Sequence, residues 1–331
     1  MSNGLRRIQV IVKWILLLTT LVVALTGCGG EAKKSPVPPV SPVGADYHVD
    51  AINGSNTNNG LTAATAFKTI TQALNTVNAL GLAGYFGKVI LVHPGTYDAP
   101  LGEVFPLTVP DGVELIGNET SKGLGTLIRH TDITQHGIEL LSQAVLAGLE
   151  IRAEDKSVQY SGLAAVHVAN TEGNTMIRNN TVDGTTLGQS WFDGIAVEGI
   201  NDNVFGNTIK GMAWGLVLGG GLGGSGTVVQ DNRIIGNEYA LGRNFGSVSD
   251  MGGGGKSTGG NVFSCSQQLD VVIYGGGPDA LQNNYWDNAT PTSVNGTTGT
   301  GQDIGLQFSP TPPNTTGAQS VSALGLTPCI P

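Results

Sequence analysis

One short segment that recurs five times constrains the fold more than any other feature of this sequence. Each copy holds an Asn near its start and apolar residues after it: NNTVDG (179–184), GNTIKG (206–211), DNRIIG (231–236), GNVFSC (260–265) and NNYWDN (283–288). The shared residues are Asn180, Asn207, Asn232, Asn261 and Asn284, with spacings of 27, 25, 29 and 23 residues. A repeat of this length indicates units that stack and bury themselves against one another.

Short apolar strands that begin with glycine precede several of these segments: GIEL (137–140), GLAAV (162–166), GIAV (194–197) and GLVL (215–218). A strand, a turn, a second strand and an Asn corner form the pattern of one coil of a parallel β-helix. Alternate apolar side chains would fill the interior, and the corner Asn would bond backbone groups of neighbouring coils. A β-sandwich, the main alternative, would show hairpin turns instead of Asn columns. We therefore expect an all-β chain folded as a single-stranded parallel β-helix over residues 46–287.

Three consecutive stretches between residues 46 and 123 carry a family resemblance: DYHVDAINGSNTNNG (46–60), AFKTITQALNTV (66–77) and VILVHPGTYDAPLGEVFPLTVPDGVELIGNE (89–119). Together they resemble the N-terminal domain of unknown function found in bacterial pectin-lyase-like β-helix lipoproteins. The resemblance implies a right-handed, pectin-lyase-type β-helix. It implies no catalytic residues, because no activity is established for that family.

The same region predicts a helix from Phe67 to Leu80 that ends at Gly81. Its apolar stripe comprises Ile70, Ala73, Leu74, Val77 and Leu80. An open β-helix end exposes an edge strand and an apolar cross-section, so we expect this helix to cap the N-terminal end. His93, which follows the strand VILV (89–92), is expected at a corner of the scaffold rather than in a catalytic site.

The first 27 residues have the pattern of a secretory signal peptide: Arg6, Arg7 and Lys13, then an apolar run from Trp14 to Leu25. The run is short for a transmembrane helix. The sequence LTGC (25–28) resembles the lipobox of bacterial lipoproteins, which implies lipidation of Cys28. Residues 28–45 are rich in Pro and Ser and would form a tether. We therefore expect an exported protein that is lipid-anchored to the surface of a bacterial membrane.

The charge balance disfavours one class of partner. Residues 1–27 hold 3 of the 16 basic residues and no acidic ones, so the mature chain has 13 Lys and Arg against 25 Asp and Glu, a net charge of −12. Nucleic acid is therefore not expected as a partner, because binding phosphates requires positive charge. Neutral or basic polymers and divalent cations remain compatible with this charge. We expect a monomer.

Two further cysteines remain after Cys28, namely Cys265 and Cys329, and an oxidising compartment would allow them to pair. The C-terminal tail, residues 288–331, is rich in Thr, Ser, Gly and Pro and is too poor in apolar residues to fold alone. We expect the tail to be loose or to lie along the coils.

Several motifs predict no chemistry. GLGGSG (221–226) lacks the βαβ unit of a dinucleotide site, and GGGGKST (252–258) has Asp250 where a phosphate loop needs its first Gly. Both are expected to be glycine-rich turns. NTIKG, with Lys210, resembles an element of polygalacturonases, but the paired aspartates and the Gly-His-Gly of those enzymes are absent. We expect Lys210 to pair with Asp183 of the preceding coil.

Aromatic residues and one carboxylate stand just before or at the start of the main strands: Tyr160, Trp191, Phe192, Asp193, Trp214 and Tyr239. Stacked in successive coils, such rings would bind a polysaccharide running along the helix axis, with Asp193 accepting hydroxyl hydrogen bonds. The alternative, which the sequence leaves open, is that the rings cover the mouth of the core.

Other candidate residues are more scattered. His167 and Glu198 could sit side by side and perform acid–base chemistry, or form only a solvated pair. Lys210 and Arg243 are the available bases for a lyase, and Asp193 is a further catalytic candidate. The loop DAINGSNTNNG (50–60) offers Asp50, Asn53 and Asn56 as oxygen ligands for Ca²⁺, without the spacing of a known calcium loop. No other cofactor is expected.

Three functional hypotheses follow, and the sequence alone leaves open whether the protein is an enzyme. The leading one is a surface lipoprotein whose β-helix binds cell-surface or extracellular polysaccharide. The second is a polysaccharide lyase or glycoside hydrolase acting in a groove along the main strands. The third is a structural envelope protein or a scaffold for a protein partner.

Overall fold

The structure is a computed structural model, and it describes residues 44–329 apart from residue 133 and residues 155–161, 170–171, 188–189, 191, 220–223, 246, 276–278, 289, 297–301 and 309–311. Cys28, the expected signal segment and residues 28–43 of the expected tether lie outside the described residues. No helix within the described ranges has the length and apolar character needed to cross a membrane.

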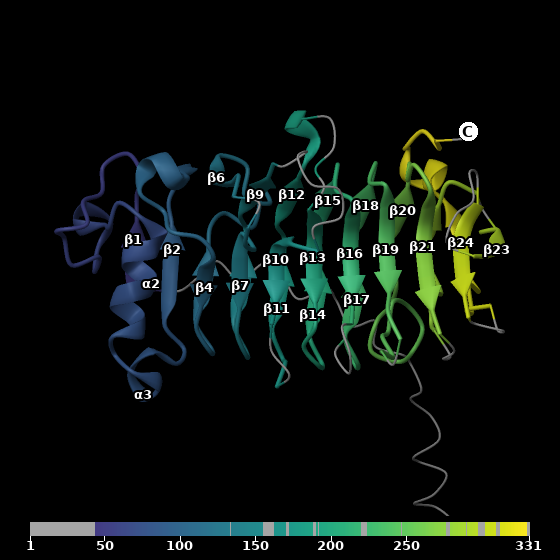
Figure 1. Cartoon of the computed structure of the whole chain (residues 1–331), viewed down its shortest axis with the longest axis horizontal. Coiled ribbons are helices and arrows are strands. Elements are labelled where there is room, and N and C mark those ends of the chain that lie inside the picture. The colour runs from purple at the N-terminus through teal and green to yellow at the C-terminus, as the bar shows by residue number, and fades with distance from the viewer. Residues whose placement is uncertain are drawn as a thin grey trace, which may run out of the picture. The chain divides into compact units, whose positions relative to one another are not determined.

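Short strands of the described chain assemble into three parallel sheets, which we call A, B and C (Figure 1). Sheet A contains β1 (Tyr47–Val49), β2 (Val89–Val92), β5 (Glu114–Ile116), β8 (Val145–Ala147), β11 (Met176–Arg178), β14 (Asn203–Phe205) and β17 (Val228–Gln230). Sheet B contains β3 (Gly95–Tyr97), β6 (Thr126–His130), β9 (Glu150–Ala153), β12 (Thr181–Asp183), β15 (Thr208–Lys210), β18 (Arg233–Ile235), β20 (Val262–Ser264), β22 (Tyr285–Trp286) and β25 (Gln319–Ser320). Sheet C contains β4 (Leu107–Val109), β7 (Ile138–Leu140), β10 (Ala164–Val168), β13 (Asp193–Val197), β16 (Trp214–Leu218), β19 (Tyr239–Arg243), β21 (Leu269–Tyr274), β24 (Gln302–Gln307) and β23 (Ser293–Asn295).

From β4 to β18, each coil passes through sheet C, then sheet A, then sheet B, and the next coil begins again in sheet C. In the later coils an isolated bridge residue (Asp250, Ala280 or Asn314) takes the place of the sheet A strand. For example, β7, β8 and β9 form one coil, and β10 then pairs with β7 in parallel, with Val166 beside Ile138. Short helical segments interrupt this path: η1 (Ala63–Thr65), α2 (Ile70–Asn78), α3 (Leu82–Tyr85), η2 (Ala99–Leu101), η3 (Thr185–Leu187) and η4 (Val321–Leu324). The chain is a right-handed parallel β-helix, which confirms the fold expected from the sequence.

Columns of like side chains fill the interior. The inward column of sheet C comprises Val166, Ile195, Leu216, Leu241, Val271 and Ile304. Each of these side chains is at most 2% exposed, and burial of one such side chain stabilises the fold by about 1.5–3 kcal/mol. This column fixes which positions of each strand face outward.

The repeated asparagines form a buried ladder at the corner between sheets A and B. The Oδ1 atom of Asn207 accepts hydrogen bonds from the backbone N–H of Asn180 at 3.0 Å and from its amide at 3.1 Å. Asn232 serves Asn207 in the same way, and the pattern continues through Asn261 to Asn284. The ladder therefore satisfies backbone and amide groups that would otherwise be buried without partners.

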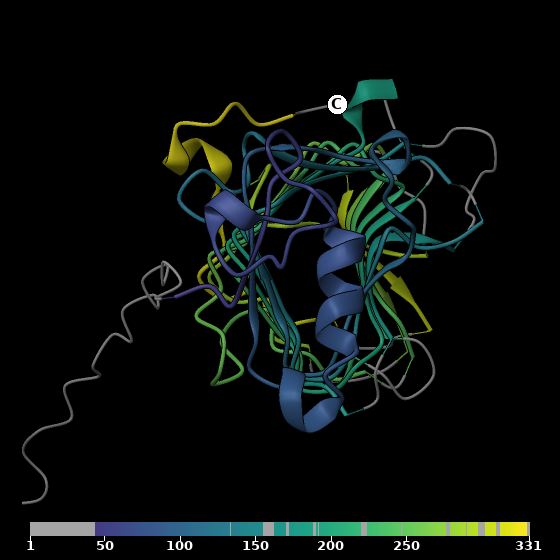
Figure 2. The same ribbon diagram turned by 90° about the vertical axis from the view of Figure 1, so that its left-hand side faces the viewer.

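Helix α2 lies across the N-terminal end of the coils, as Figure 2 shows. It buries Ile70, Ala73, Leu74 and Val77, which confirms the expected capping helix. The helix is shorter than we expected, because it begins after its N-cap residue Thr69 and ends at Asn78, and Leu80 is 46% exposed. The chain turns away from the cap after Asn78, so Leu80 does not join the buried stripe.

His93 lies beside β1, the first strand of sheet A. Its Nε2 atom is 3.0 Å from Nδ1 of His48, and its backbone N–H donates to the carbonyl of Val49. These contacts place His93 in the scaffold near the N-terminal cap.

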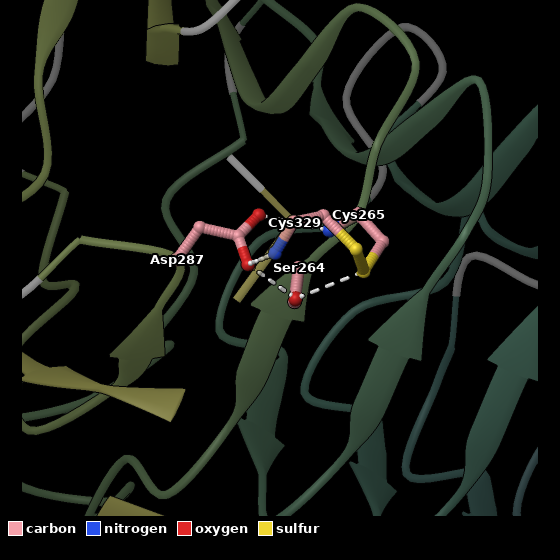
Figure 3. Close-up of a disulfide and its surroundings, with 4 residues drawn as sticks. All are labelled: Ser264, Cys265, Asp287 and Cys329. Atoms are coloured by element: carbon pink, nitrogen blue, oxygen red, sulfur yellow. Dashed lines mark hydrogen bonds between the residues drawn. A yellow bond between two sulfur atoms is a disulfide. The ribbon is translucent and has the colours of Figure 1, made fainter. Parts of the chain in front are cut away.

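The parallel pairing continues beyond residue 287, where we expected the β-helix to end. Strand β24 pairs with β21, and β25 pairs with β22. Cys265 and Cys329 form a disulfide that joins the end of β20 to the segment after η4 (Figure 3). The Asp287 carboxylate lies beside it and accepts hydrogen bonds from the backbone N–H groups of both cysteines, each at 2.9 Å. Much of the tail is therefore part of the coil.

Candidate functional site

The outer face of sheet C collects most of the candidate residues. Strands β13 and β16 share one burial pattern, in which the first and fourth residues are partly exposed and the other three are buried. The first positions of neighbouring strands stack as Ala164, Asp193, Trp214, Tyr239 and Leu269. The fourth positions stack as Glu139, His167, Ala196, Val217, Gly242 and Val272. The partly exposed members of these columns form the surface that a ligand would meet, namely Glu139, His167, Asp193, Ala196, Trp214 and Val217.

An aromatic stack covers the middle of this face. The rings of Trp214 and Tyr239 lie 4.1 Å apart at their centroids and 12° from parallel. Trp214 also covers Gly242, since a Cβ atom at that glycine would come within 2.9 Å of the indole. Tyr239 is only 8% exposed and packs with the buried side chains of Leu269 and Val272. Tyr239 therefore supports the indole from below, and Trp214 is the ring that a ligand can reach.

Asp193 stands beside Trp214 in the same column. Its backbone is fixed by a hydrogen bond from its N–H to the carbonyl of Leu163 at 2.8 Å. The side chain is partly exposed, but protein surrounds most of the carboxyl group, and this burial raises its pKa to about 7. Near neutral pH, Asp193 can therefore either donate or accept a hydrogen bond.

Two stacked histidines occupy the part of the face over β7, β10 and β13. The rings of His136 and His167 lie 4.0 Å apart at their centroids and 13° from parallel. Burial, together with the neighbouring His167, lowers the pKa of His136 to about 4. His136 is thus neutral at physiological pH, and its Nδ1 atom accepts the backbone N–H of Ala164 at 3.0 Å.

Glu198 completes this group, with Oε2 at 3.6 Å from Nε2 of His167. The expected contact between His167 and Glu198 is thus present in the geometry. The Nδ1 atom of His167 is buried and has no hydrogen-bond partner. The outer face of sheet C therefore has two parts. Over β7 to β13 it carries histidine and carboxyl side chains, and over β16 to β24 it carries aromatic ones. The two parts meet where Asp193 lies beside Trp214.

Comparison with known proteins identifies the family. Residues 52–293 match DUF1565, which is described as a protein family of unknown function. The chain belongs to the DUF1565 family. None of the curated proteins matches the chain.

Several solved structures resemble this DUF1565 chain. A rhamnogalacturonan lyase has 18% identity and a TM-score of 0.39, with 83% of this chain and 66% of that chain covered. The pectate lyase Pel9A has 12% identity and a TM-score of 0.37, with coverage of 82% and 78%. A rice weevil pectin methyl esterase has 13% identity and a TM-score of 0.44, with coverage of 83% and 90%. At these identities the likenesses concern the fold alone.

Several residues expected to join the site lie elsewhere. Phe192 is fully buried in the core, so it cannot be part of a ligand platform. Tyr160 and Trp191 lie outside the described residues. Lys210 of sheet B pairs with Asp183 at 2.9 Å, as expected, and not with any group of sheet C. Arg243 is fully buried and donates to the Asp279 carboxylate at 2.5 Å, so it cannot act as an accessible base.

The candidate calcium ligands hold their own loop together. Both carboxylate oxygens of Asp50 accept hydrogen bonds from the turn at Asn53, and Oδ1 of Asn56 accepts the backbone N–H of Lys68 at 2.9 Å. In the described part of the chain, the one cluster with three potential metal-ligand atoms within 4.8 Å comprises Cys265, Asp287 and Cys329. Its two sulfur atoms are bonded to each other, so the cluster does not suit a metal.

A surface pocket of about 500 Å³ lies beside α3, which contributes Leu82, and the segments that follow β4 and β7 of sheet C contribute Asp111 and Gln143. It contains neither the aromatic stack nor the histidine pair. We therefore take the outer face of sheet C as the candidate site.

His136 is a site residue that was not expected from the sequence, although a signal for it exists. The triplets His-Gly-Ile (136–138), Asp-Gly-Ile (193–195) and Trp-Gly-Leu (214–216) are equivalent in the coils. The residue before the glycine is the outward one in each. An alignment that started one residue earlier would have found His136 together with Asp193 and Trp214.

Proposed function

We propose that this protein binds a polysaccharide on the outer face of sheet C, with Trp214 as the platform. The observation that carries the proposal is the position of the partly exposed indole, which covers Gly242 and is stacked on Tyr239 beside Asp193. Such a ring can pack against the C–H face of a sugar, and stacking of this kind is worth about 0.5–1.5 kcal/mol beyond the area buried. The Asp193 carboxyl would hydrogen-bond to the sugar hydroxyls.

The charges favour a neutral polysaccharide. In the described strands of sheet C, no outward position carries Lys or Arg. Glu139 and Asp193 of these strands, and Glu198 directly after β13, supply carboxyl groups. A chain of uronic acids would meet these carboxylates without a cation to compensate them. The expected net charge of −12 for the mature chain adds repulsion at long range.

The proposal includes a place of action. A lipid on Cys28 and the tether to residue 45 would hold the β-helix at the surface of a bacterial membrane. There it could reach polysaccharides of the cell surface or of the surrounding medium. Only the sequence of the N-terminal segment supports this part of the proposal.

Binding of the purified protein to immobilised glycans tests the proposal. We expect retention on one or more neutral polysaccharides (cellulose, xylan, mannan or chitin) and none on polygalacturonate or alginate. Trp214→Ala should reduce the affinity by about 1–2 kcal/mol. Phe86→Ala, an exposed aromatic residue that lines the pocket beside α3, is the matched control and should bind normally. If Trp214→Ala binds like the wild type while remaining folded, the platform is wrong.

A second candidate function is acid–base catalysis, which the contact between His167 and Glu198 favours. Asp193 and Glu198 carry two of the carboxyl groups of this face, and their Cα atoms lie five residues apart in extended chain, about 16 Å at the usual rise per residue. The carboxyl groups of glycosidase pairs are separated by about 5–9.5 Å. Release of reducing ends or of unsaturated products from the same glycan panel, lost in His167→Ala, would support catalysis. If neither binding nor turnover is found, the scaffold hypothesis remains.

A further inference from the structure

A second aromatic group lies at the other end of the sheet C strands. Phe245 and Phe308 occupy equivalent positions two coils apart, with Gly275 at that position in the coil between them. The two rings approach to 5.9 Å between centroids. Gly275 makes this possible, because a Cβ atom there would lie 2.5 Å from the Phe245 ring.

These two rings are unusually exposed for their type. Phe245 is 54% exposed and Phe308 is 73% exposed. Phe308 also has a φ of 58°, a left-handed conformation that bulky residues rarely adopt. Packing in the core explains neither feature. Strained backbone of this kind is concentrated at functional sites.

Tyr274 joins the second group to the first. Its ring lies 6.2 Å from that of Phe245, and its side chain packs against the buried cluster of Tyr239, Leu269 and Val272, against which Trp214 also packs. Apolar side chains therefore connect the two aromatic groups across the sheet. From Tyr239 to Phe245 the chain runs six residues, about 20 Å at the usual rise per residue, which is the length of an oligosaccharide rather than of a single sugar.

We propose that Phe245, Tyr274 and Phe308 form a second sugar-binding subsite, and that one neutral polysaccharide chain runs along the strands of sheet C from Trp214 to Phe308. The inference rests on the proposed function, because Trp214 provides the first subsite. The proposed glycan chain runs along the strands, whereas the sequence analysis expected a glycan that runs along the helix axis. Along the helix axis, the column that contains Asp193 and Trp214 ends in the buried Leu269. Along the strands, exposed rings continue as far as Phe245 and Phe308, near the C-terminal ends of the sheet C strands.

The surface between the two subsites suits a sugar chain. No described outward position from β16 to β24 carries a charged side chain. Leu269 covers Gly305 as Trp214 covers Gly242, and Leu269 itself is buried, so the side chains beneath this surface are apolar. The amide of Gln307 lies in register with Tyr274 and supplies a hydrogen-bonding group beside the ring. An uncharged face with flat rings and an amide matches a neutral glycan.

Chain-length dependence tests the inference. The probes are the disaccharides and hexasaccharides of cellulose, xylan, mannan and chitin, and their binding to the full mature chain is measured by calorimetry. Phe245→Ala and Phe308→Ala should each weaken hexasaccharide binding about threefold to tenfold and leave disaccharide binding at Trp214 unchanged. Trp214→Ala should weaken both. Val248→Ala, an exposed apolar residue near Phe245, is the matched control and should change neither.

Each remaining outcome is decisive. If Trp214→Ala weakens binding but Phe245→Ala and Phe308→Ala bind hexasaccharides like the wild type, the second subsite is wrong and the proposed function stands. If no hexasaccharide binds, both fail. If the wild type binds phosphatidylcholine and phosphatidylglycerol vesicles through Phe308 instead, the patch is a lipid contact and the inference is overturned. Both phenylalanine variants should unfold thermally like the wild type, because these rings are exposed.

Discussion

Asp270 of β21 and Asp303 of β24 occupy the same inward position of neighbouring coils, and both side chains are buried. The Asp303 carboxylate accepts hydrogen bonds from the backbone N–H of Thr292 at 2.7 Å and from its hydroxyl at 2.9 Å. The Oδ1 atom of Asp270 has no hydrogen-bond partner. Burial, with added repulsion from Asp287 and Asp303, raises the pKa of Asp270 to about 8. Asp270 is therefore protonated at neutral pH.

This raised pKa predicts how stability depends on pH. Between the unfolded pKa of 3.8 and the folded value of about 8, the folded state binds one more proton than the unfolded state. The contribution of Asp270 is thus fully present below pH 3.8 and is lost as the pH rises toward 8, by about 1.4 kcal/mol per pH unit. Urea unfolding across this range should show a flatter pH profile for Asp270→Asn than for the wild type. An equal slope in both proteins would contradict the assignment.

The asparagine ladder predicts a specific loss of stability. Asn207→Leu should cost about 1–3 kcal/mol of unfolding free energy, because the buried backbone N–H of Asn180 and the carbonyl of Ile177 lose their partner. Denaturant unfolding measures the change. Asn75→Leu, an exposed position of α2, is the control and should shift stability by less than about 0.5 kcal/mol. Equal effects at both positions would mean that the ladder bonds contribute little.

Asp193 should make glycan binding depend on pH. With a pKa of about 7, the carboxyl gains a proton as the pH falls from 8 to 6. A charged acceptor forms stronger hydrogen bonds than a neutral one, so the affinity for the neutral glycan should fall severalfold over this range. Asp193→Asn should bind more weakly at pH 8 and show no such change. A wild-type affinity that does not change with pH would exclude Asp193 from the contact.

The disulfide should leave no reactive thiol at Cys265 or Cys329. It closes a loop of 64 residues, which by loop entropy stabilises the fold by about 4 kcal/mol. Thiol titration of denatured, unreduced Cys28→Ser protein checks the bond, and unfolding with and without reductant checks its contribution. Two titratable thiols in the unreduced sample would show that the bridge does not form.

Attachment to a membrane rests on Cys28. We expect labelled palmitate to be incorporated into the protein in its native host and to be lost in Cys28→Ser. The variant should then appear in the soluble fraction. Label that persists in Cys28→Ser would place the modification at another residue or exclude it.

The sequence predicted the repeat better than it predicted the surface. Asn180 and Asn207 could be aligned without a structure, because every coil needs the same buried amide at the same corner. The sequence placed Trp191 and Trp214 in neighbouring coils, whereas in the structure the residue in register with Trp214 is Asp193. Phe245 and Phe308 could not be placed, because the turns after sheet C differ in length and the interior pattern does not constrain them. The burial of Arg243 was missed for a related reason, since its partner Asp279 lies in a turn.

The Asn ladder has a direction, because each side-chain amide oxygen accepts a hydrogen bond from the Asn of the preceding coil. Every coil in the ladder therefore makes the same hydrogen bonds with its neighbours. A whole coil can therefore be gained or lost without changing the interface on either side of it. Strands stack about 4.8 Å apart, so the body can lengthen or shorten in uniform steps of that size during evolution. In an engineered chain, a duplicated copy of residues 207–231 would extend the ladder by one rung and widen the sheet C face by one strand.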